Sequence, residues 1–284
     1  MARLDKAVRR EIRRRVERAT ERVRDDRRDR AARVHEARRD LKKARAALRL
    51  LRPRLPSKRF RRENAALRDA GKALSRVRDA QALPAALDAL VGRSRRFAAA
   101  RRTLAAAARS ASPDGTLARA TRGPLDDAAS GLRRLRPDAR RWRAVAKGLR
   151  RTYAAGRRLM KAARESGRDE DFHEWRKAAK YLRYQLELLF PEDQTISGQA
   201  TELHRLSDLL GEDHDLGALA ARAASDVPAF GGAAAVRRLG VLIERRRAAL
   251  RREALGLGAS LYAPRPKDAG AAWRSARGSA RTSS

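Results

Sequence analysis

The sequence predicts an all-α protein, and three observations lead to this fold class. Residues that favour helices, chiefly Ala, Arg, Leu and Glu, fill the chain, and β-branched residues are scarce. Apolar residues recur at the spacing of a helix and do not alternate as in a strand. Pro, Gly, Asp and Ser gather at intervals that divide the chain into roughly eight to ten helices.

The helices can be placed in order from these intervals. A first helix is expected over about residues 3–25. Helix breaks are expected at 52–57, before Pro84, at 112–115, near 123–124, and at 136–138, 165–169, 191–193 and 227–228. The helical domain should span residues 1–262. The remaining residues, 263–284, are small, polar and rich in Pro and Gly, so a disordered basic tail is expected there.

One long segment occurs twice. His35–Pro53 and His173–Pro191 share the pattern H-E-x-R-[RK]-x-x-K-x-x-R-x-x-L-x-L-L-x-P without a gap, and the two histidines are 138 residues apart. This repeat predicts two homologous halves, about 1–136 and 139–262, each with about four or five helices. The second half therefore contains its own first helix, over about residues 139–165.

The charge of the chain calls for an anionic partner. The sequence has 70 Lys and Arg against 34 Asp and Glu, a formal net charge of +36 at pH 7. Such a charge repels itself in a compact protein, so DNA, RNA, an anionic membrane surface and polyphosphate are the candidate partners. Arginine outnumbers lysine, and its planar guanidinium binds phosphate oxygens in pairs.

Other functional classes are disfavoured. The chain has no cysteine, which excludes disulfides and thiol catalysis. It has no apolar run of about 18 residues, so no membrane association is expected. Its first residues lack the apolar centre of a signal peptide, which predicts a cytoplasmic protein.

The repeated segment carries its bases on one side. On a helix, the His and the basic positions +3, +7 and +10 fall within an arc of about 80°. At 1.5 Å per residue this stripe is about 15 Å long, which suits several consecutive phosphates. The alternative is that these bases coat a solvated helix face. The second copy of the same spacing favours the phosphate-binding interpretation.

No enzyme signature is present. There is no P-loop, no GxGxxG and no nucleophile elbow. The zinc pattern H-E-x-x-H is also excluded, because the residue four positions after His35 is Arg39 and the residue four positions after His173 is Lys177. Gly211–Asp215 resembles a metal loop but is interpreted as a turn and helix start, with Asp215 orienting arginines as its counterpart Asp79 would. We therefore expect no catalytic residue, no metal and no cofactor.

The doubled H-x-x-R-x-x-x-K-x-x-R helix, followed in the second copy by L-x-x-L-L-G-x-x-x-D, resembles the CHAD domain family over about residues 3–262. The resemblance implies two four-helix-bundle halves related by a pseudo-twofold axis around a central basic pore. It also implies binding of inorganic polyphosphate and, in some members, location at polyphosphate granules. Carried onto this chain, the implied polyphosphate contacts are His35, Arg38, Arg39, Lys42, Arg45, His173, Arg176, Lys177, Lys180, Arg183 and Tyr184.

Two alternatives stay open. A nonspecific nucleic-acid-binding protein of the nucleoid type would use the same charge, and nucleic acid would then compete with polyphosphate. Aromatic residues make up only 4% of the chain and do not alternate with the bases, which disfavours single-strand binding. The second alternative is a scaffold whose basic tail recruits an acidic protein.

Overall fold

The computed structural model describes residues 4–25, 29–92, 94–110, 116–133 and 142–282. Within these ranges the protein is all-α, as predicted, with three short 3₁₀ turns and no strand. The helices are α1 (Leu4–Arg24), α2 (Arg30–Leu51), α3 (Ser57–Ala73), α4 (Ser75–Val91), α5 (Ala98–Ser110), α6 (Thr116–Arg133), α7 (Trp142–Ser166), α8 (Asp169–Leu189), α9 (Gln194–Ser225), α10 (Ala233–Leu261) and α11 (Pro266–Thr282).

The helix boundaries follow the sequence repeat. A shift of 138 residues moves the start of α1 onto the start of α7 and the end of α2 onto the end of α8. The same shift places α3 and α4 along the single long helix α9. The two differ at Leu74, where the first half breaks between α3 and α4 and the second half continues as one helix.

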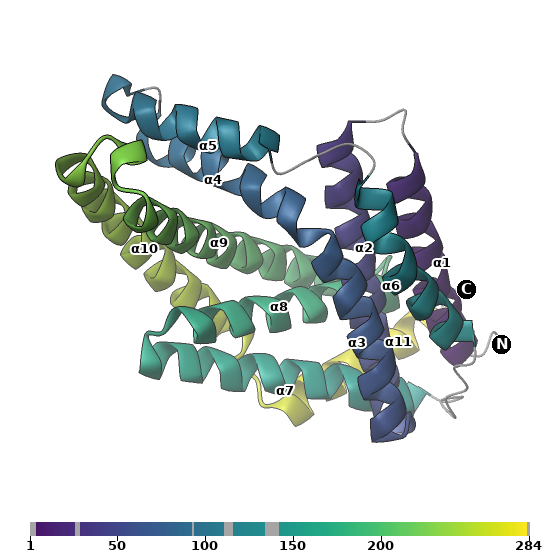
Figure 1. The fold of residues 1–284 in the computed structure, drawn as a ribbon. Coiled ribbons are helices and arrows are strands. Elements are labelled where there is room, and N and C mark those ends of the chain that lie inside the picture. Colours follow the sequence, from purple (N-terminus) through teal and green to yellow (C-terminus); the bar gives the residue numbers. More distant parts are fainter. Residues whose placement is uncertain (1–3, 26–28, 93, 111–115, 134–141, 283–284) are drawn as a thin grey trace.

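Figure 1 shows how the helices are grouped. α1, α2, α3 and α6 pack together on one side, and α7, α8, α9 and α10 pack together on the other. α4 and α5 extend over α9 (Figure 1). α2 joins the two groups, because it contacts α7 and α8 as well as α1 and α3.

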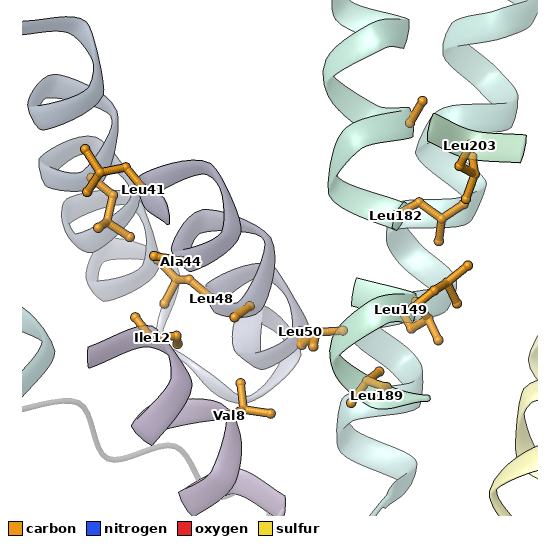
Figure 2. Close-up of a cluster of buried hydrophobic side chains, with 14 of the residues drawn as sticks. Val8, Ile12, Leu41, Ala44, Leu48, Leu50, Leu149, Leu182, Leu189 and Leu203 are labelled. Carbon is orange, nitrogen blue, oxygen red and sulfur yellow. The ribbon is translucent and has the colours of Figure 1, made fainter. Parts of the chain in front are cut away.

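The larger hydrophobic core crosses this junction. Leu50 of α2 lies between the side chains of α1–α2 and those of α7–α9 (Figure 2). Gly148 of α7 lets the two helices approach closely, because a Cβ at this position would be 2.7 Å from the Leu50 Cα. A second buried cluster lies between α4, α5, α9 and α10 and includes Leu87, Phe97, Leu216 and Ile243.

Several expected breaks are confirmed and two are wrong. Helices end and restart at 52–57, 165–169, 191–193 and 227–228, whereas 112–115 and 136–138 lie outside the described residues. Pro84 lies inside α4 and Pro124 inside α6. α4 packs mainly against α5 and α9, and α6 packs against α1 and α3. This packing compensates for the hydrogen bond that proline removes.

The expected disordered tail is also wrong. Residues 266–282 form α11, which packs on α7. Trp273 is 2% exposed, and its ring meets that of Tyr153 edge to face at 5.6 Å. Ala269 is buried beside it, so two apolar residues four apart give α11 a narrow buried face that outweighs its polar composition. None of the described helices is long and apolar enough to cross a membrane.

Candidate functional site

The two repeated helices pack directly on each other. The Gln185 side-chain amide of α8 donates a 2.8 Å hydrogen bond to the Ala46 carbonyl of α2, and Lys43 forms a 3.2 Å ion pair with Glu187. Residue numbers rise along α2 as they fall along α8, so the helices run antiparallel at this contact. A small buried cluster closes it, made of Ala46, Tyr181 and Tyr184.

The motif histidines lie in the second turn of their helices. His35 is exposed, whereas His173 is partly buried and stacks on His214 with ring centroids 4.5 Å apart. Burial and then the neighbouring charges of His214, Lys177 and Arg176 lower the pKa of His173 to about 4. His173 is therefore neutral at pH 7.

The arginines at position +3 hold corresponding places in the two halves. The Arg38 Nη1 donates to the Gly71 carbonyl of α3 at 3.1 Å, and the Arg176 Nε donates to the Ser207 carbonyl of α9 at 3.3 Å. Each arginine thus ties its helix to the next helix of the same half. The sequence predicted a phosphate contact here and did not predict this structural bond.

A first cavity, which we name the arginine pocket, holds about 490 Å³ between α2, α3, α7 and α8. Among the described residues that line it, Glu174 is the only one with a carboxylate, and it pairs with Lys177. Burial, followed by repulsion from Arg151 and Arg49, lowers the pKa of Arg52, and burial is also the main cause that lowers the pKa of Arg45. The seven basic side chains of the pocket are Arg45, Arg49, Arg52, Arg68, Arg151, Arg158 and Lys177.

A second cavity, which we name the mixed cleft, holds about 720 Å³ between α2, α4, α8 and α9. Its lining includes the bases His35, Arg39, Arg176 and Lys180 and the acids Glu36, Asp208, Glu212 and Asp215. Three of these carboxylates already have partners outside the cleft, because Glu36 contacts Arg22, Asp208 contacts His204 and Glu212 contacts Arg246. In the cleft itself, basic and acidic side chains are equal in number.

The predicted site residues are divided between these places. Arg45 and Lys177 line the arginine pocket, and His35, Arg39, Arg176 and Lys180 line the mixed cleft. Arg183 and Tyr184 are buried at the α2–α8 contact, where Arg183 pairs with Glu187 at 2.9 Å and its guanidinium lies 4.6 Å from the Tyr184 ring centroid. These two residues line neither cavity, and the same is true of Arg38, Lys42 and His173.

Burial raises the pKa of Tyr184, so its hydroxyl stays protonated at neutral pH. With 7% of the residue exposed, Tyr184 contributes mainly to the helix contact. The predicted bases therefore lie on more than one face of α2 and α8, and six of them are divided between the two cavities.

Five arginines of the pocket were not singled out from the sequence. Arg49 follows the motif on α2, Arg52 begins the 3₁₀ turn directly after α2, Arg68 comes from α3, and Arg151 and Arg158 come from α7. The only available signal was the spacing of Arg151 and Arg158, seven residues apart and therefore on one face of a helix. Sequence alone did not indicate which face of α7 meets α2.

The prediction for the acidic segment Gly211–Asp215 is also wrong. Gly211–Asp215 lies inside α9 and is neither a turn nor a helix start. Gly211 lies under Arg176, and Asp215 lines the mixed cleft, whereas the side chain of Asp79 lies outside the described residues. Buried Asp213 binds Arg247 at 3.0 Å and Arg251 at 2.9 Å, and both arginines also bind Asp169. This network joins α8, α9 and α10.

No three His, Asp or Glu side chains among the described residues are grouped as metal ligands would be. Comparison with curated proteins gives no match to this chain. The family model of the CHAD domain, in contrast, matches residues 7–224, from α1 to the last turn of α9. The match includes both copies of the repeated helix and most of the chain. The protein therefore belongs to the CHAD domain family.

Proposed function

We propose that this protein binds inorganic polyphosphate without turning it over, through the bases that α2 and α8 present around their contact. The observation that carries this proposal is the gathering of bases around this contact: seven basic side chains face one carboxylate in the arginine pocket, and four bases of the repeated motif line the mixed cleft. Anion binding would relieve the repulsion among these bases, and guanidinium–phosphate hydrogen bonds are among the strongest in proteins.

Membership of the CHAD family supports the choice of polyphosphate, since this domain is associated with polyphosphate-related proteins. The dimensions of the pocket support it as well. A duplex carries its phosphates on a rigid rod, which cannot enter a cavity of about 490 Å³, whereas a flexible phosphate chain can. Such binding would also place the protein at polyphosphate granules.

The double substitution Arg176→Ala/Lys180→Ala tests the proposal on the motif itself. Both residues line the mixed cleft, so affinity for long-chain polyphosphate should fall at least about tenfold, the equivalent of one lost charge-assisted hydrogen bond. The matched control is Arg237→Ala/Arg238→Ala, which removes two exposed charges from α10 and should change affinity less than about threefold. Affinity is measured by titration calorimetry after circular dichroism has confirmed folding.

Equal affinities of the two variants would contradict the assignment of the motif to the binding site. Duplex DNA, added as a competitor at physiological salt, should displace polyphosphate poorly, and efficient displacement would favour the nucleic-acid alternative. Release of orthophosphate when the same mixtures contain Mg²⁺ or Mn²⁺ would contradict the non-enzymatic part of the proposal.

A further inference from the structure

We infer that the arginine pocket is a single, one-sided site for a short run of consecutive phosphates, and that Arg151 and Arg158 of α7 bind this run. The inference rests on the proposed function for its ligand chemistry. It adds two residues that lie outside the repeated motif, and it specifies that each protein molecule binds one run of phosphates in this pocket.

The size of the pocket sets the size of the ligand. A volume of about 490 Å³ is within the range of about 300–1,000 Å³ that is usual for small-molecule sites. A long polyphosphate can therefore place only one segment in it. A free short oligophosphate and a segment of a long chain carry the same linear anhydride chemistry and would bind in the same way.

Most of the charge of the pocket is left without internal compensation. Glu174 pairs with Lys177, and Arg68 pairs with Asp69 at 2.9 Å. The five other arginines, Arg45, Arg49, Arg52, Arg151 and Arg158, have no carboxylate partner within the described part of the chain.

Arg49 shows most clearly that the pocket lacks a hydrogen-bond acceptor. Its guanidinium lies 4.3 Å from the Tyr181 ring centroid, and its buried Nε has no hydrogen-bond acceptor among the described residues. A buried donor without an acceptor is costly, and an anionic oxygen in the pocket would supply that acceptor.

The bases are spread over a length that suits several phosphates. Arg151 and Arg158 lie on one face of α7, about 10 Å apart along its axis at 1.5 Å per residue. Arg45 and Arg49 follow one another along the facing side of α2, and Arg52 continues the row in the 3₁₀ turn directly after it. A single phosphate cannot reach bases that are so far apart, whereas a run of phosphates can.

The repeat shows that the other half keeps only part of this site. At a shift of 138 residues, Glu187, Phe190, Leu206 and Thr20 replace Arg49, Arg52, Arg68 and Arg158, whereas Arg183, Arg13 and Arg39 stand in the places of Arg45, Arg151 and Lys177. Glu187 is occupied by Arg183 at 2.9 Å and by Lys43 at 3.2 Å. The counterpart of the arginine pocket has therefore lost four of its seven bases, and Arg183, one of the three that remain, is paired with Glu187. The anion is held on the side of the α2–α8 pair that keeps all seven.

Titration of the full chain with linear tripolyphosphate tests the inference. The wild-type protein should bind one tripolyphosphate, and Arg151→Ala/Arg158→Ala should weaken binding at least about thirtyfold. Both side chains are exposed, so the variant should fold. The control Arg157→Ala/Arg164→Ala removes the same charge at the same spacing from exposed positions of α7 outside the pocket, and should weaken binding less than about threefold.

A third variant, Arg151→Lys/Arg158→Lys, keeps the charge and removes the paired donors of guanidinium, so its loss should be intermediate. Saturation with long-chain polyphosphate separates the two ligand sources. If two protein molecules bind each polyphosphate molecule at saturation, the pocket takes the ends of the polyphosphate. A larger number indicates that it takes internal segments.

Two results would overturn the inference, namely equal tripolyphosphate affinity of Arg151→Ala/Arg158→Ala and its control, or two equivalent tripolyphosphate sites per chain. Either result leaves the proposed function intact if long-chain polyphosphate binding still depends on Arg176 and Lys180. Loss of that dependence, with tripolyphosphate binding retained in the pocket, would instead contradict the motif assignment alone.

Discussion

Arg176 performs a structural task that its place in a binding motif conceals. Its Nε donates to the Ser207 carbonyl of α9, and its guanidinium lies against Gly211, one turn further along the same helix. A Cβ at position 211 would be only 2.7 Å from the Arg176 Nη2. The glycine of the L-L-G sequence therefore makes room for the arginine of the preceding helix.

We predict different outcomes for alanine at two glycines of α9. Gly198 is exposed and no described atom lies within 4 Å of its added Cβ, so Gly198→Ala should stabilise the fold by about 0.5–1 kcal/mol. Gly211→Ala should lose this gain, because the displaced Arg176 gives up a hydrogen bond worth about 1 kcal/mol. The measurement is the free energy of unfolding in urea. An equal gain in both variants would show that Arg176 does not lie on Gly211.

Single residues also show why the sequence predicted only part of the candidate site. The spacing within the repeat identified bases on α2 and α8, and six of them line the two cavities. It could not assign a base to a cavity, because that depends on how the two helices cross. Arg151 and Arg158 could not be distinguished among 70 basic residues, since their role depends on the packing of α7 against α2.

At the level of helices, composition and packing disagree at Pro84, at Pro124, at Leu74 and in the tail. Prolines 84 and 124 predicted breaks that packing overrides, and the actual break at Leu74 is marked by neither Gly nor Pro. The tail composition predicted disorder, but burial of Ala269 and Trp273 forms α11. Breaks were predicted correctly where several turn-forming residues coincide, as at 165–169 and 191–193.

The packing of α11 can be tested on Trp273. Its indole contacts the Tyr153 ring, and its Nε1 donates to the Gln199 Oε1 at 3.3 Å. Trp273→Ala should lower the free energy of unfolding by about 3 kcal/mol, in keeping with other buried aromatic truncations. The control Arg274→Ala alters an exposed neighbour and should change it by less than about 0.5 kcal/mol. Similar small losses in both variants would mean that α11 does not pack on α7 in solution.

For the whole molecule, the formal charge of +36 is the dominant property. Ion pairs such as the Asp169–Asp213–Arg247–Arg251 network neutralise part of it locally. The arginine pocket concentrates a further part, and five of its arginines have no carboxylate partner among the described residues. Self-repulsion therefore opposes folding, and the same repulsion favours binding of a polyanion.

Salt should consequently act in opposite directions on the free and the bound protein. Between about 10 mM and 150 mM salt the screening length falls from about 30 Å to about 8 Å, so repulsion weakens and the melting temperature of the free protein should rise. Polyphosphate should add a further stabilisation that depends on the ratio of its concentration to its Kd. Its affinity falls with salt as counterions compete, so this added stabilisation should shrink over the same range.

Thermal melts across a salt series, with and without long-chain polyphosphate, measure both effects. As salt increases, the melting temperature of the free protein should rise. The amount by which polyphosphate raises the melting temperature should shrink, so the two values should converge. The Arg237→Ala/Arg238→Ala variant should converge in the same way, because its exposed charges lie outside both cavities. An increment that is constant across the series would mean that apolar contacts, and not the bases around α2 and α8, hold the ligand.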